Sequence, residues 1–306
     1  MQMINYFKMK TNSFIITLLL SMMLFTACEK SLLPDRTVVA DGARICFFNL
    51  SPDAPEMNLY FNNVRVTTQQ STIVGKLRGI PYRSSYPGPI TIVPTATTVP
   101  APYVGAEYFV TTAGTTAIIA KDTVAAIPTT FFTTNFNFVK DKYYSFFASD
   151  PKSTMAPFVI EDNIVAFETL KKSKIRCVNA ISGVVGNKID VWMIHQPTLT
   201  SWAIAPYKLA SGLDYKGATQ FTDTISSANY RWIVTKAGAV PTATTTPTAV
   251  GAAYTMTFAT ADVIIKVATT NTNLAERSTY SFLFYGLATG TGVSAPFGST
   301  FRNRLK

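Results

Sequence analysis

The sequence has few of the side chains that enzymes use most often. Its 306 residues contain one histidine, His195, and three cysteines. A nucleophile needs a base that a third group orients, and a zinc site usually needs several His or Cys ligands. Neither can be assembled here, so we expect no catalytic site, no metal and no cofactor, and we interpret His195 as a surface or strand-end residue. A pair of carboxylates, as in glycoside hydrolases, leaves an enzyme as an open alternative, because two acids can meet in space without a sequence motif.

Charged residues are also scarce, at 14% of the chain. Residues 1–27 hold two lysines and no acid, so without them 25 Lys plus Arg face 17 Asp plus Glu, a net charge of +8. The basic residues are scattered, apart from Lys171–Lys174 and Arg302–Lys306. Because a nucleic-acid-binding surface needs clustered basic charge, we expect no nucleic-acid partner. The positive net charge favours long-range electrostatic attraction to anionic lipid or surface polysaccharide.

No apolar run is long enough to cross a bilayer as a helix. The longest extends from Phe14 to Phe25, whereas a membrane-spanning helix needs about 20 residues. Lys8 and Lys10 precede it, and small residues follow it. This basic, apolar, small-residue order is typical of a secretory signal. We therefore expect residues 1–27 to be a cleaved signal peptide.

The end of this segment, Leu24–Cys28, resembles a bacterial lipoprotein box, in which a peptidase cleaves before a cysteine that carries a diacylglycerol. Phe25 stands where the family usually has a smaller aliphatic residue. The resemblance implies lipidation of Cys28 and a tether over residues 28–40. Several acyl chains of the palmitate type anchor stably, since each buried methylene contributes about 0.8 kcal/mol. Glu29 follows the cysteine, where aspartate would suggest inner-membrane retention, so the resemblance favours the outer membrane of a Gram-negative cell, on its surface or its periplasmic face.

The rest of the chain lacks long helical periodicity. Thr, Val, Ile, Phe and Tyr dominate it, and Pro, Gly, Asn and Ser interrupt the strand-like runs at short intervals. This pattern favours antiparallel β-sandwiches over a parallel sheet with helices. Two stretches alternate between apolar and polar residues, which places successive side chains on opposite faces of a strand. We predict inward positions for Met57, Leu59, Phe61, Ile189, Val191 and Met193, and outward positions for Asn58, Tyr60, Asp190 and Trp192.

An internal repeat organises the sequence. Five segments of the first half recur in the same order in the second half, which is hard to obtain by chance. The paired segments begin at Arg44 and Lys174, Val93 and Val240, Val104 and Val250, Tyr144 and Tyr280, and Ala156 and Ala295. We infer two homologous lobes, residues 41–168 and 169–306. Each is predicted to be an Ig-like antiparallel β-sandwich domain, so the predicted fold class is all-β with two such domains in tandem.

The segment Ala43–Asn63, "ARICFFNLSPDAPEMNLYFNN", resembles the opening motif of a bacterial family known as domain of unknown function forty-three ninety-seven. In that family a strand, a Ser-Pro-Asp-Ala-Pro turn and a second alternating strand recur in extracytoplasmic proteins, often lipoproteins and often in tandem. The second lobe has Ser182–Gly186 in place of that turn, so a role of Asp53 would not extend to it. The resemblance implies a β-sandwich and an envelope location, and it brings no catalytic residues.

Cys46 and Cys177 suggest a disulfide in an oxidising compartment. However, aligning Asn49 with Asn179 puts Cys46 one position earlier in its strand than Cys177. An offset of one residue turns a side chain to the opposite face. Cys177 then occupies the core position that Phe47 has in the first lobe. We therefore expect two unpaired thiols rather than a bridge between the lobes.

Outward aromatic rings are the candidate ligand-stacking residues. Tyr60 and Trp192 hold matching repeat positions on the non-core face, and Trp202 and Trp232 add two rings in the second lobe. Flat rings stack on sugars and anchor protein partners. The alternative is that a loop or the other lobe covers this face, or that the rings brace an edge strand.

Two threonine-rich segments, Val93–Pro102 and Val240–Val250, lie at the same place in each lobe. We therefore interpret them as long loops of the fold rather than as glycosylated stalks or linkers. Asp-Thr-aliphatic triplets at Thr123 and Thr224 resemble an acceptor motif for periplasmic O-glycosylation. These two threonines are candidate glycosylation sites.

Together these features favour a non-catalytic cell-envelope lipoprotein with a structural, adhesive or partner-binding role at the outer membrane. The expected partners are membrane lipid through Cys28 and a surface glycan or another envelope protein. A carbohydrate-binding accessory to a glycan-uptake system is the alternative function.

Overall fold

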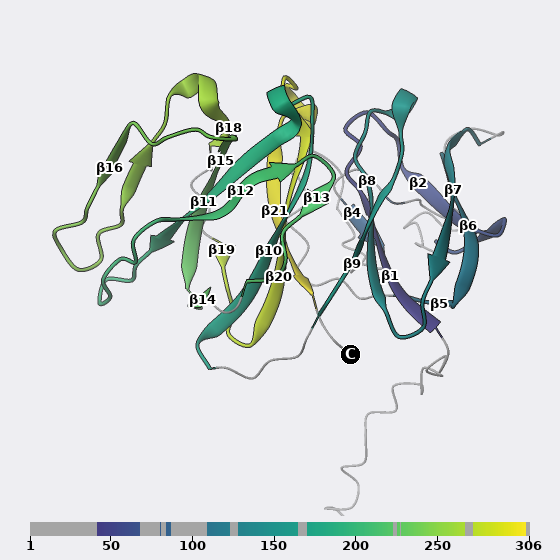
Figure 1. Ribbon diagram of the computed structural model, residues 1–306, viewed down its shortest axis with the longest axis horizontal. Coiled ribbons are helices and arrows are strands. Elements are labelled where there is room, and N and C mark those ends of the chain that lie inside the picture. The colour runs from purple at the N-terminus through teal and green to yellow at the C-terminus, as the bar shows by residue number, and fades with distance from the viewer. Residues whose placement is uncertain are drawn as a thin grey trace, which may run out of the picture. The chain divides into compact units, whose positions relative to one another are not determined.

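Strands make up almost all of the regular structure. The computed structural model divides the chain into two units, Met1–Ala40 and Asp41–Lys306, and every described residue belongs to the second unit (Figure 1). The described residues are 42–67, 80, 84–86, 109–122, 128–164, 170–222, 225–226, 228–266 and 272–303. Their helical structure consists of the 3-10 turns η1 Lys152–Thr154, η2 Val185–Asn187, η3 Thr260–Asp262 and η4 Gly292–Ser294. The all-β prediction is confirmed.

The first lobe, defined here as β1–β9, is a sandwich of two sheets. One sheet has the order β4-β1-β8-β9 with β5 also paired to β1, and the other has the order β3-β2-β6-β7. Phe47 and Phe146 of the first sheet pack in one buried cluster with Met57 and Ile118 of the second. The strands are β1 Gly42–Asn49, β2 Met57–Phe61, β3 Val64–Arg65, β4 Ser84–Tyr86, β5 Phe109–Thr112, β6 Gly114–Asp122, β7 Thr130–Phe138, β8 Tyr143–Ala148 and β9 Phe158–Glu161.

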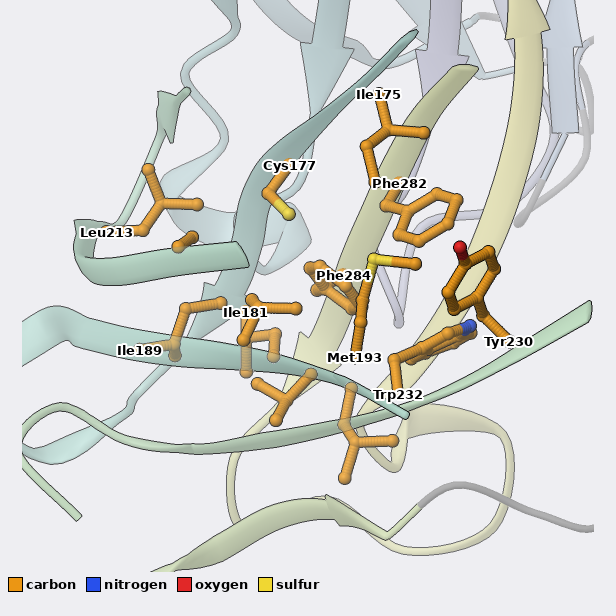
Figure 2. Packing of buried hydrophobic residues seen from close by; sticks show 14 of the residues in the cluster. Ile175, Cys177, Ile181, Ile189, Met193, Leu213, Tyr230, Trp232, Phe282 and Phe284 are labelled. Atoms are coloured by element: carbon orange, nitrogen blue, oxygen red, sulfur yellow. The ribbon is translucent and has the colours of Figure 1, made fainter. Parts of the chain in front are cut away.

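The second lobe, β10–β21, has the same plan with one addition. Its sheets have the orders β13-β10-β20-β21, with β14 on β10, and β12-β11-β15-β18, with β19 on β15; β16 and β17 form a separate hairpin. Figure 2 shows 14 of the side chains that are buried between the two sheets. The strands are β10 Lys172–Ser182, β11 Lys188–Gln196, β12 Tyr207–Asp214, β13 Gly217–Ala218, β14 Ile225–Ser226, β15 Asn229–Lys236, β16 Ala243–Thr245, β17 Thr255–Thr257, β18 Val263–Lys266, β19 Thr272–Asn273, β20 Ser278–Leu287 and β21 Phe297–Asn303.

The pairing of the strands repeats in chain order. Strand β1 pairs with β4, β5 and β8, and β10 pairs with β13, β14 and β20; β2 and β6 likewise correspond to β11 and β15. Among the described pairs, β1–β8 and β10–β20 are parallel and the others are antiparallel. A parallel pair needs a long crossover, and in each lobe the intervening strands supply it. This agreement is what the inferred duplication predicts.

Two buried asparagines hold equivalent places in this pattern. Asn49 donates from Nδ2 to Ile80 O at 2.9 Å, and its Oδ1 accepts from the N–H of Ser51 at 3.3 Å. Asn179 donates to Leu213 O at 3.0 Å and accepts from the N–H of Ile181 at 3.1 Å. The alignment of Asn49 with Asn179 is therefore matched by their hydrogen bonds.

The alternation in β2 and β11 is confirmed for the inward positions. Met57, Leu59, Phe61, Ile189, Val191 and Met193 are all buried in the two cores. On the outward faces, Tyr60 and Trp192 are half-buried. Asn58 and Asp190 are fully covered although they point away from the cores, with exposed fractions of 6% and 0%.

A third apolar cluster joins the two lobes. It combines outward side chains of the β1–β8 sheet with those of the β10–β20 sheet, because each sheet turns one face to its own core and the other to the partner lobe. Its members are Cys46, Phe48, Leu50, Phe147, Val178, Ala180, Leu283, Tyr285 and Phe301. We call this contact the inter-lobe joint.

The Ser-Pro-Asp-Ala-Pro turn of the first lobe lies beside the chain that follows β8. Asp53 Oδ1 accepts a hydrogen bond from the N–H of Lys152 at 2.7 Å, and Ser51 Oγ donates to Asp150 O at 2.6 Å. The turn thus ties the start of the lobe to its end.

Candidate functional site

The matching outward rings, Tyr60 and Trp192, are each overlaid by a lysine of a neighbouring strand. Lys121 Nζ lies 5.0 Å from the ring centroid of Tyr60, and Lys208 Nζ lies 4.6 Å from that of Trp192. Phe258 also packs against Trp192, with the ring centroids 5.5 Å apart. These cation–π and ring contacts occupy surfaces that a sugar would need for stacking. The arrangement favours the alternative in which the outward face is covered. The rings do not brace edge strands, because β2 and β11 lie inside their sheets.

A buried carboxylate fixes the lysine over Trp192. Asp190 Oδ2 accepts from Lys208 Nζ at 2.8 Å and from Gly238 N at 3.0 Å, and Oδ1 accepts from Gly212 N at 2.7 Å. Burial alone would raise the pKa of Asp190, but these hydrogen bonds outweigh it and hold the pKa below its ordinary value. Asp190 is therefore a charged anchor for Lys208 at neutral pH.

Trp232 was predicted as a stacking residue, and the structure corrects this. Its side chain is 8% exposed and packs against Phe282 and Phe284 in the second core (Figure 2). Its Nε1 donates to Thr272 Oγ1 at 3.1 Å. The ring also lies against Gly298 of β21, where a Cβ would collide with it. The sequence signal was present, because Trp232 is in phase with inward Tyr230 and Val234 in β15.

Trp202 is the predicted ring that the structure leaves free. Its side chain is 60% exposed in the β11–β12 loop, and it makes no ring, cation or hydrogen-bond contact with any described residue. The turn before it is closed by a hydrogen bond from Ser201 N to Thr198 O at 3.1 Å and by one from Thr198 N to Ser201 Oγ at 2.9 Å. The ring is thus presented by an ordered turn.

Sequence reasoning missed the apolar residues around Trp202. Leu199 is 92% exposed, Ile204 42% and Val250 44%. The loop after β16 meets the β11–β12 loop where Gly251 N donates to Ser201 O at 3.1 Å. We call these residues, with Trp202, the Trp202 surface. The signal that could have located it is the lack of Asp, Glu, Lys and Arg throughout residues 191–207 and 237–261.

The lone histidine supports the far side of the same loop. His195 is at the end of β11, as predicted, but it is 7% exposed and not a surface residue. Its Nδ1 accepts from Ile204 N at 3.1 Å, and its ring lies edge-on to Tyr230 at 5.5 Å. Burial lowers the pKa of His195, which keeps Nδ1 unprotonated and able to accept this bond.

Both described cysteines are free and buried, as predicted. Cys46 belongs to the inter-lobe joint and Cys177 to the second core, so their side chains face different clusters. Burial raises the pKa of each thiol well above its ordinary value. A thiol that stays protonated is a poor nucleophile.

The threonine-rich segment of the second lobe belongs to the fold. Residues 240–250 include β16, which pairs with β17 in an exposed hairpin between β15 and β18. Thr242 and Thr257 contact each other through their hydroxyls at 3.1 Å. The matching segment of the first lobe, residues 93–102, and the candidates Cys28, Thr123 and Thr224 lie outside the described residues.

Within the part of the chain that the structure describes, no three His, Cys, Asp or Glu residues gather as metal ligands would. Over the same residues, no helix has the length and apolar character needed to cross a membrane. In the comparisons with known proteins, no family model and no curated protein matches the chain.

Proposed function

We propose that this protein is a non-catalytic lipoprotein of the outer membrane with a structural or adhesive role, anchored through Cys28. The observation that carries the proposal is the inter-lobe joint, which makes the two sandwiches a single scaffold. The joint buries nine side chains of the two lobes against one another. Such a scaffold holds the loops of both lobes in fixed positions for binding a partner, and this role needs no catalytic residues.

Polar contacts reinforce the joint. The buried pair Arg176 and Asp162 links β10 to the end of the first lobe, with Arg176 Nη2 2.5 Å from Asp162 Oδ1. Ser145 Oγ donates to Asp162 Oδ2 at 2.6 Å, and Arg176 Nε donates to Ser281 Oγ at 2.8 Å. A buried ion pair needs such additional bonds, because its desolvation is costly. The hydrogen-bonded ion pair therefore favours this one arrangement of the two lobes.

A second polar contact crosses the joint near its edge. Asp150, just after β8, accepts from Tyr215 Oη at 2.6 Å and from Lys216 Nζ at 2.7 Å. Burial, and next the bond to Asp150, raises the pKa of Tyr215, so the phenol stays a neutral donor. These contacts oppose hinge motion between the lobes, which suits a display or scaffold role.

The proposed location at the outer membrane rests on the N-terminal sequence. The resemblance of Leu24–Cys28 to a lipoprotein box supports lipidation, and residues 28–40 supply a tether. Two or more acyl chains give stable membrane attachment where one does not. The proposed partner is a surface glycan or another envelope protein.

The test is protease accessibility on intact cells, with the Cys28→Ala variant run in parallel. An anchored surface protein with an adhesive role is supported by two results together: the protease digests the wild type on intact cells, and the Cys28→Ala protein is missing from the cell fraction. Protection until the outer membrane is opened supports a periplasmic scaffold. If the variant remains in the membrane fraction and the wild type takes up no labelled palmitate, lipid anchoring is wrong.

The second candidate is a carbohydrate-binding accessory of a glycan-uptake system. The specific observation in its favour is the exposed ring of Trp202, since flat rings stack on sugar faces. Calorimetric titration of the purified protein with hexasaccharides tests it. The candidate fails if none of them binds at concentrations of about 1 mM.

A further inference from the structure

We propose that the Trp202 surface is a binding site for neutral glycan chains. The inference rests on the second candidate function and names its ligand class and its location. The site combines one exposed aromatic ring, apolar neighbours, hydroxyl groups and two loop segments without Asp, Glu, Lys or Arg. Each of these features bears on which ligand fits.

The ring is the first feature. Of the aromatic side chains proposed for stacking, Tyr60 and Trp192 carry lysines, and Trp232 lies in the core. Trp202 alone among these four is mostly exposed and makes no ring, cation–π or hydrogen-bond contact with a described residue. An indole face binds the C–H face of a pyranose through apolar and weak electrostatic contact. The stacking position is therefore at Trp202.

The second feature is preorganisation of the loop. Three sets of contacts hold it: the Thr198–Ser201 turn, the bond from Gly251 N to Ser201 O, and the bond from Ile204 N to His195 Nδ1. Binding to a loop that is already ordered loses less conformational entropy. Weak contacts of the kind that sugars make then suffice for measurable affinity.

The third feature is the chemistry of the surroundings. Thr198 and Thr200 are exposed in the same turn as Trp202. Thr198 Oγ1 donates to Ser201 Oγ at 2.9 Å and contacts Thr200 Oγ1 at 3.3 Å, so the remaining lone pairs of both threonine hydroxyls can accept from sugar hydroxyls. The two segments that form the surface contain no Asp, Glu, Lys or Arg over residues 197–207 and 237–261. An acidic polysaccharide would need basic partners, and they are absent from these segments. The ligand is accordingly uncharged.

The experiment follows the indole N–H signals of the intact mature protein by NMR. The chain has three tryptophans, so nitrogen-15 labelling of tryptophan gives three signals that single Trp→Phe variants assign. Cellohexaose, maltohexaose and mannohexaose are the neutral probes, and hexagalacturonate is the acidic probe, each taken to about 10 mM to detect a Kd near 1 mM. At least one neutral probe should shift the Trp202 signal and leave that of buried Trp232 in place.

Variants and salt separate stacking from other causes. Trp202→Ala should weaken binding at least about tenfold by calorimetry, whereas Trp202→Phe, which keeps a flat ring, should stay within about threefold. Leu170→Ala is the matched control, because Leu170 is 59% exposed but lies before β10. Raising NaCl from about 0.1 M to about 1 M shortens the Debye length from about 10 Å to about 3 Å, and affinity for the neutral probe should not change.

Three outcomes would overturn the proposal. The first is binding of a neutral probe without a shift at Trp202, which would leave a glycan-binding function in place at another site. The second is a response to hexagalacturonate alone that salt abolishes, which would make the ligand acidic. The third is no binding of any probe, which would remove the glycan-binding function together with its site. The scaffold proposal is tested separately on cells.

Discussion

Strands β2 and β11 hold the same place in the two lobes, yet they bury different polar groups on their outward faces. Asn58 of β2 accepts from Arg65 Nη2 at 2.6 Å and from Thr67 Oγ1 at 3.1 Å. Asp190 of β11 accepts from Lys208 and from two backbone N–H groups. An amide in one lobe and a carboxylate in the other are both satisfied. The comparison teaches that the repeated fold requires hydrogen-bond partners at this position, not a particular charge.

Equivalent positions of the two lobes differ more at the inter-lobe joint, where one lobe has a neutral residue and the other a charged one. With Asn49 aligned to Asn179, Cys46 of the first lobe corresponds to Arg176 of the second. Both are buried at the joint side of their strands, but only Arg176 brings a charge, which pairs with Asp162. Ser145 and Ser281, equivalent in the two lobes, each bond to one member of the pair. The sandwiches repeat, whereas the joint between them is asymmetric.

The largest expected effect is at this asymmetric pair. Arg176→Met should lower the free energy of unfolding by about 3–5 kcal/mol, because it leaves the Asp162 carboxylate buried without its cation. Cys46→Ala, at the equivalent position, should cost only about 1 kcal/mol. Urea unfolding at neutral pH measures both. Adding Asp162→Asn to Arg176→Met should recover part of the loss; no recovery would show that the pair does not act as a unit.

The equivalent asparagines should give similar, smaller losses. Asn49→Ala and Asn179→Ala each strand a buried carbonyl and a buried N–H, so each should cost about 2 kcal/mol in urea unfolding. Asn58→Ala, which removes an acceptor shared by side chains, serves as the comparison within the first lobe. A difference of more than about 2 kcal/mol between Asn49→Ala and Asn179→Ala would contradict their structural equivalence.

Asp190→Asn makes the second lobe resemble the first at this position. It should cost about 1.5 kcal/mol at neutral pH, because the ion pair with Lys208 is lost and the amide NH2 cannot accept the hydrogen bonds that one carboxylate oxygen receives. Since the folded pKa of Asp190 is lowered, its stabilisation is complete above the ordinary carboxyl pKa and is lost as the pH falls through the folded value. The stability difference between wild type and variant should therefore shrink in acid. A constant difference from pH 7 to strongly acidic solution would contradict the assigned role.

The smallest expected effect is at His195, which has no histidine counterpart in the first lobe. Its folded pKa is lowered by burial, so its contribution is complete above the ordinary histidine pKa of about 6.5 and declines as the pH falls toward the folded value. Wild type should lose more stability than His195→Gln over this range. The Trp202 indole signal should shift with the same titration. A pH-independent signal would show that His195 does not control the loop.

Alternation predicted the core faces of β2 and β11 correctly, since it is a local property of the extended backbone. Met57, Leu59 and Phe61 are buried as expected. Trp232 was misassigned although its phase with Tyr230 and Val234 was readable. The candidate site was predicted only in part: Trp202 was identified, but Leu199, Ile204 and Val250 were not. Their grouping depends on a contact between two loops far apart in the chain.

The sequence by itself determined that the protein is all-β. It also determined that alternate residues of β2 and β11 face the two cores and that Cys46 and Cys177 face different ways, because both follow from the two-residue period of a strand. The sequence also contains Cys28, the proposed lipidation site. Only the tertiary structure decided which outward residues are covered. Lys208 and Phe258 lie against Trp192, glycine N–H groups surround Asp190, and Arg176 meets Asp162 across the joint. Such coverage depends on contacts between distant segments, and no local period encodes them.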